Sequence, residues 1–565
     1  MNAQSAGQVS LLVVEAGLTL IAGVTAFCWP RAGSRWFAGF ERFWVSLARR
    51  RSASVLVVGA AAVLLRLAML PVEPIPHPFI HDEFSYLLAA DTFAAGRLTN
   101  PTHPMWRYFE SFHITQQPSY MSMYFPAQGL MLAAGQVLLG NPWYGVLLSV
   151  GLMCGALCWM LQGWLPPGWA LLGGMLAVLR LGLFSNWMNG YYGGAVAAAG
   201  GALVLGAFPR MKGRATVRDG FVLAIGAIML VNSRPYEGLL VCGPAAIAIF
   251  WEYRNRLGGL ARSLAVPAVL LAIAGGLMAH YDQRVFGNAL TLPYQTNRTT
   301  YASAPVFLWQ SPRPAPGYRS KAMHDFYQVW EMGDFRLART LHGFVRVSTQ
   351  KLATAGLFFF GVALLGPLIM LGHAWRDARV RYLLVAGLVF GIGLSANAWF
   401  FPHYAAPFTG AIYVLLLQCM RHLRLYKPGG RPVGLAMVRC ALLVCLVLAG
   451  LRVYAEPLGL AVHRWPSMWY GTEPLGIPRA KVAVQLETIP GQQLAIVRYT
   501  PEHAPFDDWV YNAADIEASK VIWARELNAA GNSELLRYFR DRQVWLVEPD
   551  FTPPRVSPYP EGGSR

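Results

Sequence analysis

Charged residues are scarce in this sequence. They make up 13% of its 565 residues, while hydrophobic residues make up 55%. Soluble domains carry roughly 25% charged residues, so a chain of this length with so few lacks the polar surface that a water-soluble fold requires. The composition argues against an ordinary soluble enzyme and indicates that long segments are buried in a lipid bilayer.

Cysteine is also sparse, and its placement excludes a covalent scaffold. The seven cysteines lie in or beside apolar segments, and none lies in a long polar loop. Neither a disulfide framework nor the spacing of a zinc site is present. The cysteines are therefore predicted to pack as small hydrophobic side chains.

Acidic residues are outnumbered by basic ones, which gives a net charge of +18. Such a charge can indicate a nucleic-acid partner. Here, however, much of the Lys and Arg lies in short runs between apolar segments, which is the positive-inside pattern of membrane proteins. The charge therefore predicts membrane topology and no nucleic-acid partner.

The N-terminus lacks a charged region before its first apolar stretch, and 26–30 is a poor cleavage site. Residues 9–28 are thus predicted to form a retained helix. Twelve segments are apolar and long enough to be candidate membrane spans. They lie near 9–28, 53–71, 143–162, 167–184, 193–208, 219–232, 237–252, 264–281, 354–372, 382–400, 407–420 and 433–454.

The loops between these segments differ sharply in basic residues. One alternate set, 29–52, 163–166, 209–218, 253–263, 373–381 and 421–432, carries 20 Lys and Arg residues. The short loops of the opposite set carry only Arg97, Arg107 and Arg234. The positive-inside rule makes the first set cytoplasmic and the second external. The prediction is a multi-pass protein of a bacterial-type inner membrane.

All long polar segments then face one compartment. They are 72–126, 186–194, 232–238, 282–353, 401–407 and the tail from about 455. Residues 1–454 are predicted to form the membrane domain, with a first external loop at 72–126 and a large external loop at 282–353. Because these segments share one side, they can converge on a single extracytoplasmic site.

The C-terminal tail differs in kind from the membrane region. Strands are predicted at 493–499, 520–525 and 543–548, and helices at 480–488 and 532–540. Alternation of strands and helices favours a small α/β domain over 455–551, on the external side. The Pro-, Gly- and Ser-rich stretch 552–565 is predicted to be disordered. No catalytic motif is present in this domain, which favours an accessory role.

The pair Asp82-Glu83 in the first external loop is the strongest chemical signal. It lies shortly after a membrane helix and before an amphipathic stretch, 86–97, that is predicted to lie along the interface. Partial desolvation raises the pKa of a carboxylate and suits it to act as a general base. The alternative is that both residues only stabilise the N-terminus of a helix.

The surrounding motifs resemble those of the GT-C membrane glycosyltransferases. This class includes the dolichyl-phosphate-mannose protein mannosyltransferases, the aminoarabinose transferases of lipid A, and glycosyltransferases of lipopolysaccharide cores. The motifs are Asp82-Glu83 after a helix exit, Tyr86, Ala89-Ala90, Tyr124–Leu130 and Leu138–Asn141. The resemblance covers roughly residues 53–250, and Ala127 replaces the second proline of the aromatic-Pro-Pro motif.

The resemblance implies a bundle of many helices and a polyprenyl-phosphate-linked sugar as donor. It also implies that one acid of the pair is the catalytic base. We expect Asp82 to be that base and Glu83 its support, although the order can be reversed. His81 and Tyr86, which flank the pair, are predicted to bind the donor.

The sequence departs from the family pattern at two places. Some relatives carry a second acid in the next external loop, whereas this chain has Asn186, Asn189 and Tyr191 there. These residues can bind sugar hydroxyls or stack on a sugar, or form an interfacial aromatic belt. Relatives often have Arg-Tyr where this chain has His403-Tyr404. A neutral His binds phosphate less strongly than the bidentate Arg.

Arg234 is placed to replace that missing cation. It lies at an external helix boundary, with Pro235 at the first helical turn. It is predicted to clamp the lipid phosphate, the alternatives being a snorkelling Arg or an ion pair with Glu237. The aromatic and basic loop 282–353 is predicted to cap the substrate groove or to pack against the first loop.

These features predict an inverting glycosyltransferase that uses a polyprenyl-phosphate sugar. Its acceptor would be the hydroxyl of a glycolipid, a lipopolysaccharide or a protein, and membrane lipids would surround it. No cofactor is expected. His81, Asp82 and Glu83 offer metal ligands, but adjacent acids do not easily reach one octahedral ion, so no metal is predicted. The alternatives are a glycan polymerase or ligase that uses a lipid-linked oligosaccharide and, less in keeping with the pattern, a transporter.

Overall fold

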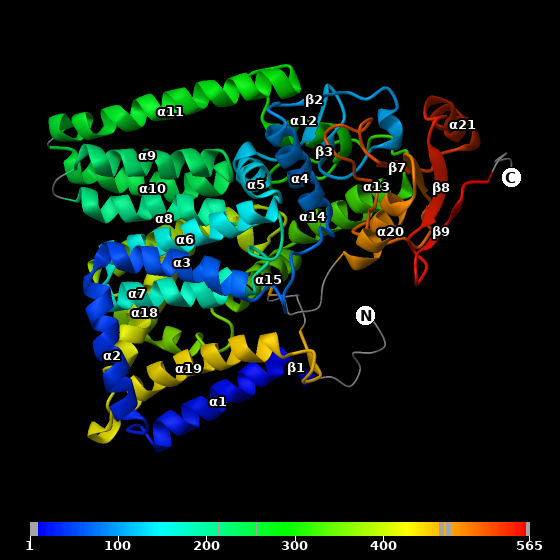
Figure 1. The fold of residues 1–565 in the computed structure, drawn as a ribbon. Helices are drawn as coiled ribbons and strands as arrows, with labels where there is room; N and C mark the ends of the chain where they lie inside the picture. Colours follow the sequence, from blue (N-terminus) through cyan, green and yellow to red (C-terminus); the bar gives the residue numbers. More distant parts are fainter. Residues whose placement is uncertain (1–8, 213–214, 256, 463–467, 470–475, 561–565) are drawn as a thin grey trace.

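Helices dominate the computed structural model, which describes residues 9–212, 215–255, 257–462, 468–469 and 476–560. Most helices run side by side in one bundle, and the strands gather beyond one end of that bundle (Figure 1). The expectation of a mainly α chain is therefore confirmed.

Six helices in the described part of the chain are long and apolar enough to cross a membrane. They are α1 (Leu11–Cys28), α3 (Arg51–Ala68), α6 (Trp143–Trp164), α11 (Leu257–Phe286), α17 (Ala378–Ala396) and α19 (Val433–Val453). Large apolar side chains on three of these helices remain uncovered, and Leu20, Leu277 and Leu388 are 71%, 66% and 65% exposed. Rows of exposed aliphatic side chains suit contact with lipid, so the chain is a membrane protein.

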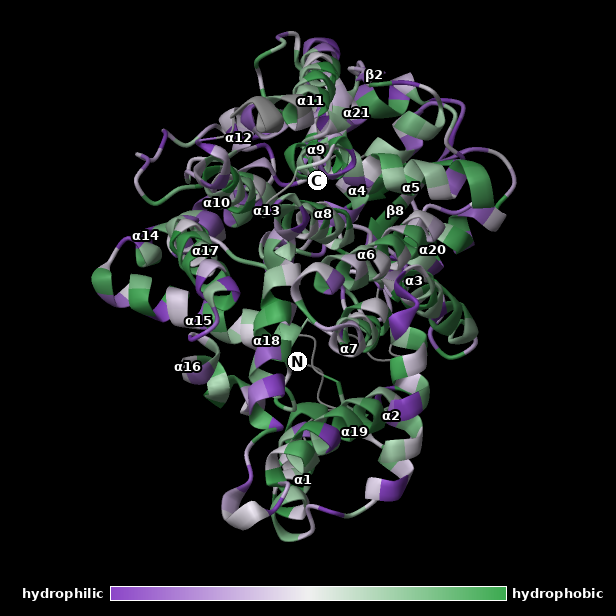
Figure 2. Cartoon of the chain, turned by 90° about the vertical axis from the view of Figure 1, so that its left-hand side faces the viewer, coloured by the Kyte–Doolittle hydropathy of each residue, from purple (hydrophilic) through white to green (hydrophobic). Residues whose placement is uncertain are grey.

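The remaining helices of the bundle are shorter or less apolar. They are α5 (Pro126–Leu139), α7 (Pro167–Ala177) with its π-helical continuation η3 (Val178–Leu183), α8 (Ala195–Met211), α9 (Val217–Val231), α10 (Pro235–Tyr253), α15 (Leu341–Phe359) and α18 (Thr409–Leu423). Hydrophobic residues predominate along the bundle in Figure 2. By length and composition, the described residues thus provide six of the roughly twelve spans expected.

The predicted span at 354–372 is wrong as a continuous helix. Helix α15 ends at Phe359, and the chain continues through a turn, the 3-10 helix η5 (Gly366–Met370) and the short α16 (Leu371–Ala374). The Glu15 carboxylate of α1 accepts hydrogen bonds from the Val362 and Ala363 N–H groups, at 2.9 and 3.1 Å. A buried carboxylate needs such donors, and the helix break supplies them.

Helix α2 (Ser34–Arg49) occupies a stretch that the sequence pattern treats as a cytoplasmic loop. It lies across the end of the bundle that is farthest from the strands (Figure 1). Its apolar side chains Trp36 and Phe43 are 87% and 67% exposed, and basic residues recur along it. A helix that exposes apolar side chains beside basic ones suits the membrane interface.

The first loop, 72–126, contains helix α4 (His81–Ala94) and a small antiparallel sheet in the order β2-β4-β3. The strands are β2 (Asn100–Pro101), β3 (Ile114–Thr115) and β4 (Ser119–Ser122), and a 3-10 helix, η2, spans Trp106–Tyr108. A Cβ on Gly129 of α5 would lie 2.8 Å from the Ala89 Cβ of α4. Glycine therefore lets α4 pack directly against α5, which fixes the start of α4 at the strand-bearing end.

The large loop, 282–353, folds over the first loop. It contains α12 (Pro293–Tyr301), α13 (Lys321–His324), the π-helical turn η4 (Asp325–Glu331) and α14 (Met332–Ala338). The rings of Phe326 and Phe112 lie 4.7 Å apart, and the Tyr301 hydroxyl bonds Glu110 at 3.1 Å. These contacts show the packing between the two loops that the aromatic composition indicates.

The C-terminal region forms a four-stranded sheet in the order β7-β6-β8-β9. Its strands are β6 (Gln493–Val497), β7 (Val521–Arg525), β8 (Gln543–Glu548) and β9 (Arg555–Pro558), and its helices are α20 (Ile477–Thr488) and α21 (Ala529–Tyr538). The three predicted strands and two predicted helices are thus present. The prediction of disorder over 552–565 is wrong for β9, which pairs antiparallel with β8; residues 561–565 lie outside the described residues.

The C-terminal region packs directly on the first loop. The ring of Tyr511 stacks on Phe84 of α4 at 4.2 Å. The Ala514 N–H donates to Asp91 at 2.7 Å, also on α4. The N-terminal strand β1 (Val9–Ser10) pairs with β5 (Leu460–Ala461) at the start of the tail. Two sequence-distant segments therefore pack on α4: the large loop, through Phe326 beside His81, and the tail, through Tyr511 and Ala514.

Candidate active site

Asp82 lies at the centre of a polar cluster in the first turn of α4. The Tyr124 hydroxyl donates a hydrogen bond to its Oδ1. His113 Nδ1 lies 3.7 Å from the same oxygen, and His81 Nε2 lies 3.4 Å from Oδ2. The side chain is 25% exposed, so the carboxylate remains reachable from outside the protein. The N-terminus of a helix favours a negative charge at this position.

The cluster holds Asp82 ionised beside neutral imidazoles. Burial acts to raise the pKa of Asp82, but His113, His81 and the Tyr124 hydrogen bond outweigh it and lower this pKa to about 2. Burial lowers the pKa of His113 to about 3 and also lowers the pKa of His81. At neutral pH the site therefore presents one carboxylate and two uncharged rings.

The hydrogen bonds of Tyr124 fix the tautomer of His113. The Tyr124 hydroxyl has one proton, and an ionised Asp82 can only accept, so Tyr124 donates to Asp82. The bond of 2.8 Å between Tyr124 and His113 Nδ1 must then be donated by the histidine. The Nε2 atom of His113 is left as an acceptor. His113 also has a φ of 61°, a conformation that is rare for residues other than glycine.

Glu83 has different surroundings from its neighbour. Its side chain is fully buried, and it accepts hydrogen bonds from the N–H groups of Phe79, Ile80 and Tyr191 at 2.9, 3.4 and 3.0 Å. Burial raises the pKa of Glu83 to about 7, while these N–H donors oppose the shift. Glu83 therefore joins the start of α4 to the loop at 186–194. Glu83 thus stabilises the N-terminus of α4, as the helix-stabilising alternative predicts. The N-cap residue of this helix is Ile80.

Arg234 and His403-Tyr404 lie on the same side of the molecule as Asp82. The guanidinium of Arg234, the residue before α10, lies 4.5 Å from the centre of the Tyr404 ring. Tyr404 and His403 belong to the 3-10 helix η6 (Pro402–Tyr404), which is followed by η7 (Ala406–Phe408). Burial, and secondly the charge of Arg234, lower the pKa of His403, so its ring is neutral at pH 7. His403 Nδ1 has no hydrogen-bond partner among the described residues.

Aromatic residues connect these groups to Asp82. Tyr86 of α4 stacks on Tyr124 at 4.3 Å, and Tyr294 of the large loop meets the Tyr124 ring edge-on at 5.5 Å. Arg234 is close enough to Tyr86 and Tyr294 for its charge to influence the pKa of both phenols, after the larger effect of burial. The site therefore combines the Asp82 carboxylate, the Arg234 guanidinium, which lies close enough to Glu237 for their charges to interact, and a wall of phenols.

Asn186, Asn189 and Tyr191 lie beneath this cluster. The Asn189 Nδ2 donates to Leu183 O at 2.7 Å, and its Oδ1 accepts from Arg66 Nε at 3.1 Å. The Tyr191 hydroxyl donates to Pro76 O at 2.8 Å. Asn186 is fully buried, and its Nδ2 lies 3.5 Å from the Tyr192 hydroxyl. With most of their polar groups bonded to the protein, these side chains are placed to support α4.

Sequence reasoning missed His113 and Tyr294, and it treated Tyr124 only as part of a motif. The histidine lies 31 positions after Asp82 and meets it because the sheet β2-β4-β3 folds the first loop back over α4. The Ser85 hydroxyl donates to His113 O at 2.6 Å, and this bond holds the folded-back part of the first loop against α4. The only signal in the sequence is the group of histidines in the first loop.

His81, Asp82 and His113 could hold a metal ion, because their ligand atoms lie within 4.8 Å of one another. Two imidazoles and a carboxylate are ligands that suit zinc and related ions. The Tyr124 hydroxyl already bonds Asp82 Oδ1 and His113 Nδ1, whereas Asp82 Oδ2 faces His81 Nε2 at 3.4 Å. The donor set fits a metal, and Tyr124 engages two of its atoms.

Two solved structures match this chain along most of its length, at low identity and with TM-scores below 0.5. The oligosaccharyltransferase of Archaeoglobus fulgidus, in complex with zinc and sulfate, has 11% identity over 88% of this chain and 67% of its own, with a TM-score of 0.48. ArnT from Cupriavidus metallidurans bound to undecaprenyl phosphate has 14% identity over 87% of this chain and 92% of its own, with a TM-score of 0.46. No family model and no curated protein matches the sequence. At this identity the chemistry must be inferred from the side chains of the site.

Proposed function

We propose that the protein is an inverting glycosyltransferase that moves a sugar from a polyprenyl-phosphate donor to an acceptor hydroxyl. The observation that carries the proposal is the partly exposed, ionised Asp82 at the strand-bearing end of a membrane helix bundle, with Arg234 on the same side. A carboxylate can receive the proton of the acceptor, and a guanidinium can neutralise a phosphate. A membrane-bound donor would explain why both lie at the end of the bundle.

In the proposed reaction the acceptor oxygen attacks the anomeric carbon from the face opposite the lipid phosphate. The bond between that carbon and the phosphate oxygen breaks, and the lipid phosphate leaves with the electron pair. Asp82 takes the proton of the acceptor hydroxyl. A pKa of about 2 makes Asp82 a weak base. It is sufficient if the proton moves late, because the attacking hydroxyl becomes strongly acidic as the new C–O bond forms.

The second role is neutralisation of the leaving phosphate. Arg234 offers five N–H donors in a planar fork, and the half-buried Tyr404 lies under its guanidinium. His403 is neutral at pH 7 and can add a hydrogen bond but no charge. In this assignment Tyr86 and Tyr404 orient the donor, and positioning and charge neutralisation supply most of the rate.

We assign this chemistry to the external face of a bacterial-type inner membrane. The positive-inside count supports that orientation, and α2 with its basic residues lies at the end of the bundle away from α4 (Figure 1). The test compares cells that lack the gene, cells complemented with wild type, and cells complemented with Asp82→Asn. Mass spectrometry of envelope glycolipids, lipopolysaccharide and exported proteins should show one sugar lost in the first and third strains. Identical glycans in all three strains would refute the proposal.

A further inference from the structure

A cavity of about 300 Å³ lies between the start of α4 and the C-terminal region. One wall belongs to the stretch that contains Asp82 and is formed by Pro78, Phe79, Ile80 and Phe84. The other wall includes residues 506–509 of the tail. Because Ile80 and Phe84 lie two positions before and after Asp82, the cavity borders the turn that carries the proposed base. Its size lies at the lower end of small-molecule sites, which measure about 300 to 1,000 Å³.

Phe506 contacts both this cavity and the Asp82 cluster. It lines the cavity, and its ring lies 6.1 Å from the ring of His81 in a stacked arrangement. His81 Nε2 in turn lies 3.4 Å from Asp82 Oδ2. One imidazole ring therefore connects Phe506 to the carboxylate.

The ring of Phe506 is 39% exposed. Phe326 and Trp330 of the large loop meet it edge-on, at 5.8 and 5.0 Å. An exposed aromatic ring beside a cavity offers a flat apolar face, and the C–H side of a sugar ring can stack on such a face and remove apolar surface from water.

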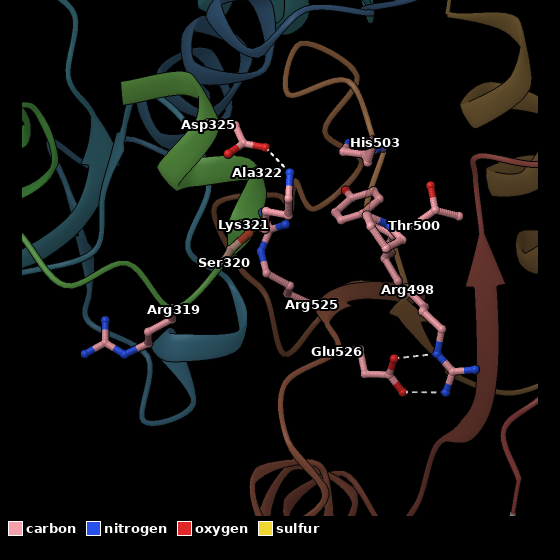
Figure 3. Close-up of a pocket in the computed structure, with 13 residues that line it drawn as sticks. Arg319, Ser320, Lys321, Ala322, Asp325, Arg498, Thr500, His503, Arg525 and Glu526 are labelled. Atoms are coloured by element: carbon pink, nitrogen blue, oxygen red, sulfur yellow. Dashed lines mark hydrogen bonds and ion pairs between the residues drawn. The ribbon is translucent and has the colours of Figure 1, made fainter. Parts of the chain in front are cut away.

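The segment that carries Phe506 is fixed on both sides of it. Asp550 accepts a hydrogen bond from the Thr500 N–H at 2.7 Å, and the buried Asp508 accepts one from Arg525 Nη2 at 2.8 Å. Figure 3 shows Thr500 and Arg525, the first after the end of β6 and the second at the end of β7. A ring that is already held in place loses little freedom when a ligand stacks on it.

The polar groups of the cavity favour a neutral ligand. Arg479 and Asp507 line it with opposite charges, and the ion pair with Arg525 offsets the charge of Asp508. Asp507 is exposed, and one of its oxygens accepts a hydrogen bond from Trp509 Nε1 at 3.2 Å. A carboxylate has further lone pairs that can accept from hydroxyl groups. A cavity with aromatic walls, hydroxyl acceptors and balanced charge suits a neutral sugar.

We propose that this cavity binds a neutral saccharide, that Phe506 stacks on one of its rings, and that this saccharide is part of the acceptor. The saccharide site follows from the walls and polar groups of the cavity. Its role as an acceptor site rests on the proposed glycosyl transfer. The C-terminal region then takes part in acceptor recognition.

The saccharide site is tested by saturation-transfer NMR titrations of the full-length protein in nanodiscs, which avoid sugar-based detergents. The probes are the methyl glycosides of glucose, galactose, mannose and N-acetylglucosamine. Sorbitol, which has hydroxyl groups but no ring, is the counterpart. We expect at least one glycoside to bind and sorbitol not to bind. Phe506→Leu should weaken glycoside binding about two- to tenfold, the value of one aromatic contact.

Two further variants make the titration specific. Phe506→Tyr keeps the ring and should bind as wild type does. Tyr538→Leu removes a ring of the C-terminal region that is 41% exposed and does not line the cavity, and it should also bind normally. Equal binding by Phe506→Leu and Tyr538→Leu would overturn the proposal, as would a Phe506→Tyr variant as weak as Phe506→Leu.

The probes supply further outcomes that would overturn it. They are a failure of all four glycosides to bind, or sorbitol binding as tightly as the glycosides. Binding of a serine-containing tripeptide in place of every glycoside would overturn it as well, because the occupant would then be a polypeptide.

The titration contains no sugar donor, so it decides the saccharide site even if no glycosyl transfer is found. If transfer is found, Phe506→Leu should raise the apparent KM for the acceptor and leave kcat near wild type, and Phe506→Tyr should restore KM. An unchanged KM in Phe506→Leu would overturn the acceptor role, whereas the transfer reaction itself would stand.

Discussion

Replacement of Asp82 by Asn tests the proposed base most directly. Asparagine has nearly the same shape, and its side-chain oxygen can still accept the hydrogen bond that Tyr124 donates to Asp82. What is lost is the negative charge and the site that takes a proton. The N-cap residue of α4 is Ile80, so the substitution does not remove a cap. The exchange should therefore separate catalysis from folding.

The expected size of the two effects differs widely. Removal of a general base typically lowers the rate by about 10² to 10⁴, which corresponds to about 3 to 5 kcal/mol of transition-state stabilisation. The loss of a charge in the first helical turn costs about 0.3 to 1 kcal/mol of stability. We thus expect Asp82→Asn to be almost inactive but to unfold within a few degrees of wild type.

The assay is single-turnover transfer from a radiolabelled polyprenyl-phosphate sugar in nanodiscs, with thermal unfolding measured on the same samples. Because the pKa of Asp82 is lowered to about 2, the carboxylate stays ionised throughout the stable pH range, and the loss should be the same at pH 5 and pH 8. Turnover of Asp82→Asn within a few fold of wild type would refute the base assignment, and His113 Nε2 would become the candidate to test next.

Glu83→Gln should have the opposite profile: one of the two carboxylate oxygens that accept three N–H hydrogen bonds is replaced by an amide donor, which costs about 1 to 3 kcal/mol of stability. Burial raises the pKa of Glu83 from 4.5 to about 7, so the folded state favours the protonated acid and wild type loses stability as the pH rises through this range; Glu83→Gln lacks that loss, and its deficit in unfolding temperature should shrink as the pH rises. Arg234→Ala should raise the apparent KM for the lipid donor about 10- to 100-fold and change kcat less, while Arg284→Ala, an exposed arginine at the end of α11, serves as the control. Chelator treatment should leave transfer intact, because Tyr124 already bonds Asp82 Oδ1 and His113 Nδ1; activity lost to the chelator and restored by zinc would contradict this. A periplasm-active reporter fused to the C-terminus should give signal, and signal only from a cytoplasmic reporter would reverse the topology.

Periodicity and charge predict which helices and strands are present in this fold better than they predict where each one ends. The C-terminal strands at 493–499, 520–525 and 543–548 were predictable, because each is an apolar run between turn residues. The break after Phe359 was not, because the sequence there stays apolar and the carboxylate that accepts hydrogen bonds from its N–H groups, Glu15, lies more than 340 positions earlier. Strand β9 was missed because Pro and Gly around it conceal a pairing that only β8 provides.

The candidate site also depends on contacts between residues far apart in the sequence, which a local pattern does not contain. A local pattern can identify Asp82-Glu83 as chemically suited residues, but both acids share one sequence environment and nothing local tells which one is accessible. The difference comes from contacts made elsewhere in the chain: Tyr191 donates to Glu83, and Tyr124 reaches Asp82. Since two adjacent positions on a helix point about 100° apart, one acid must face the supporting loop when the other faces outward. The fold therefore gives the two neighbours opposite roles, which is why the two isosteric variants, tested side by side, are the most informative pair.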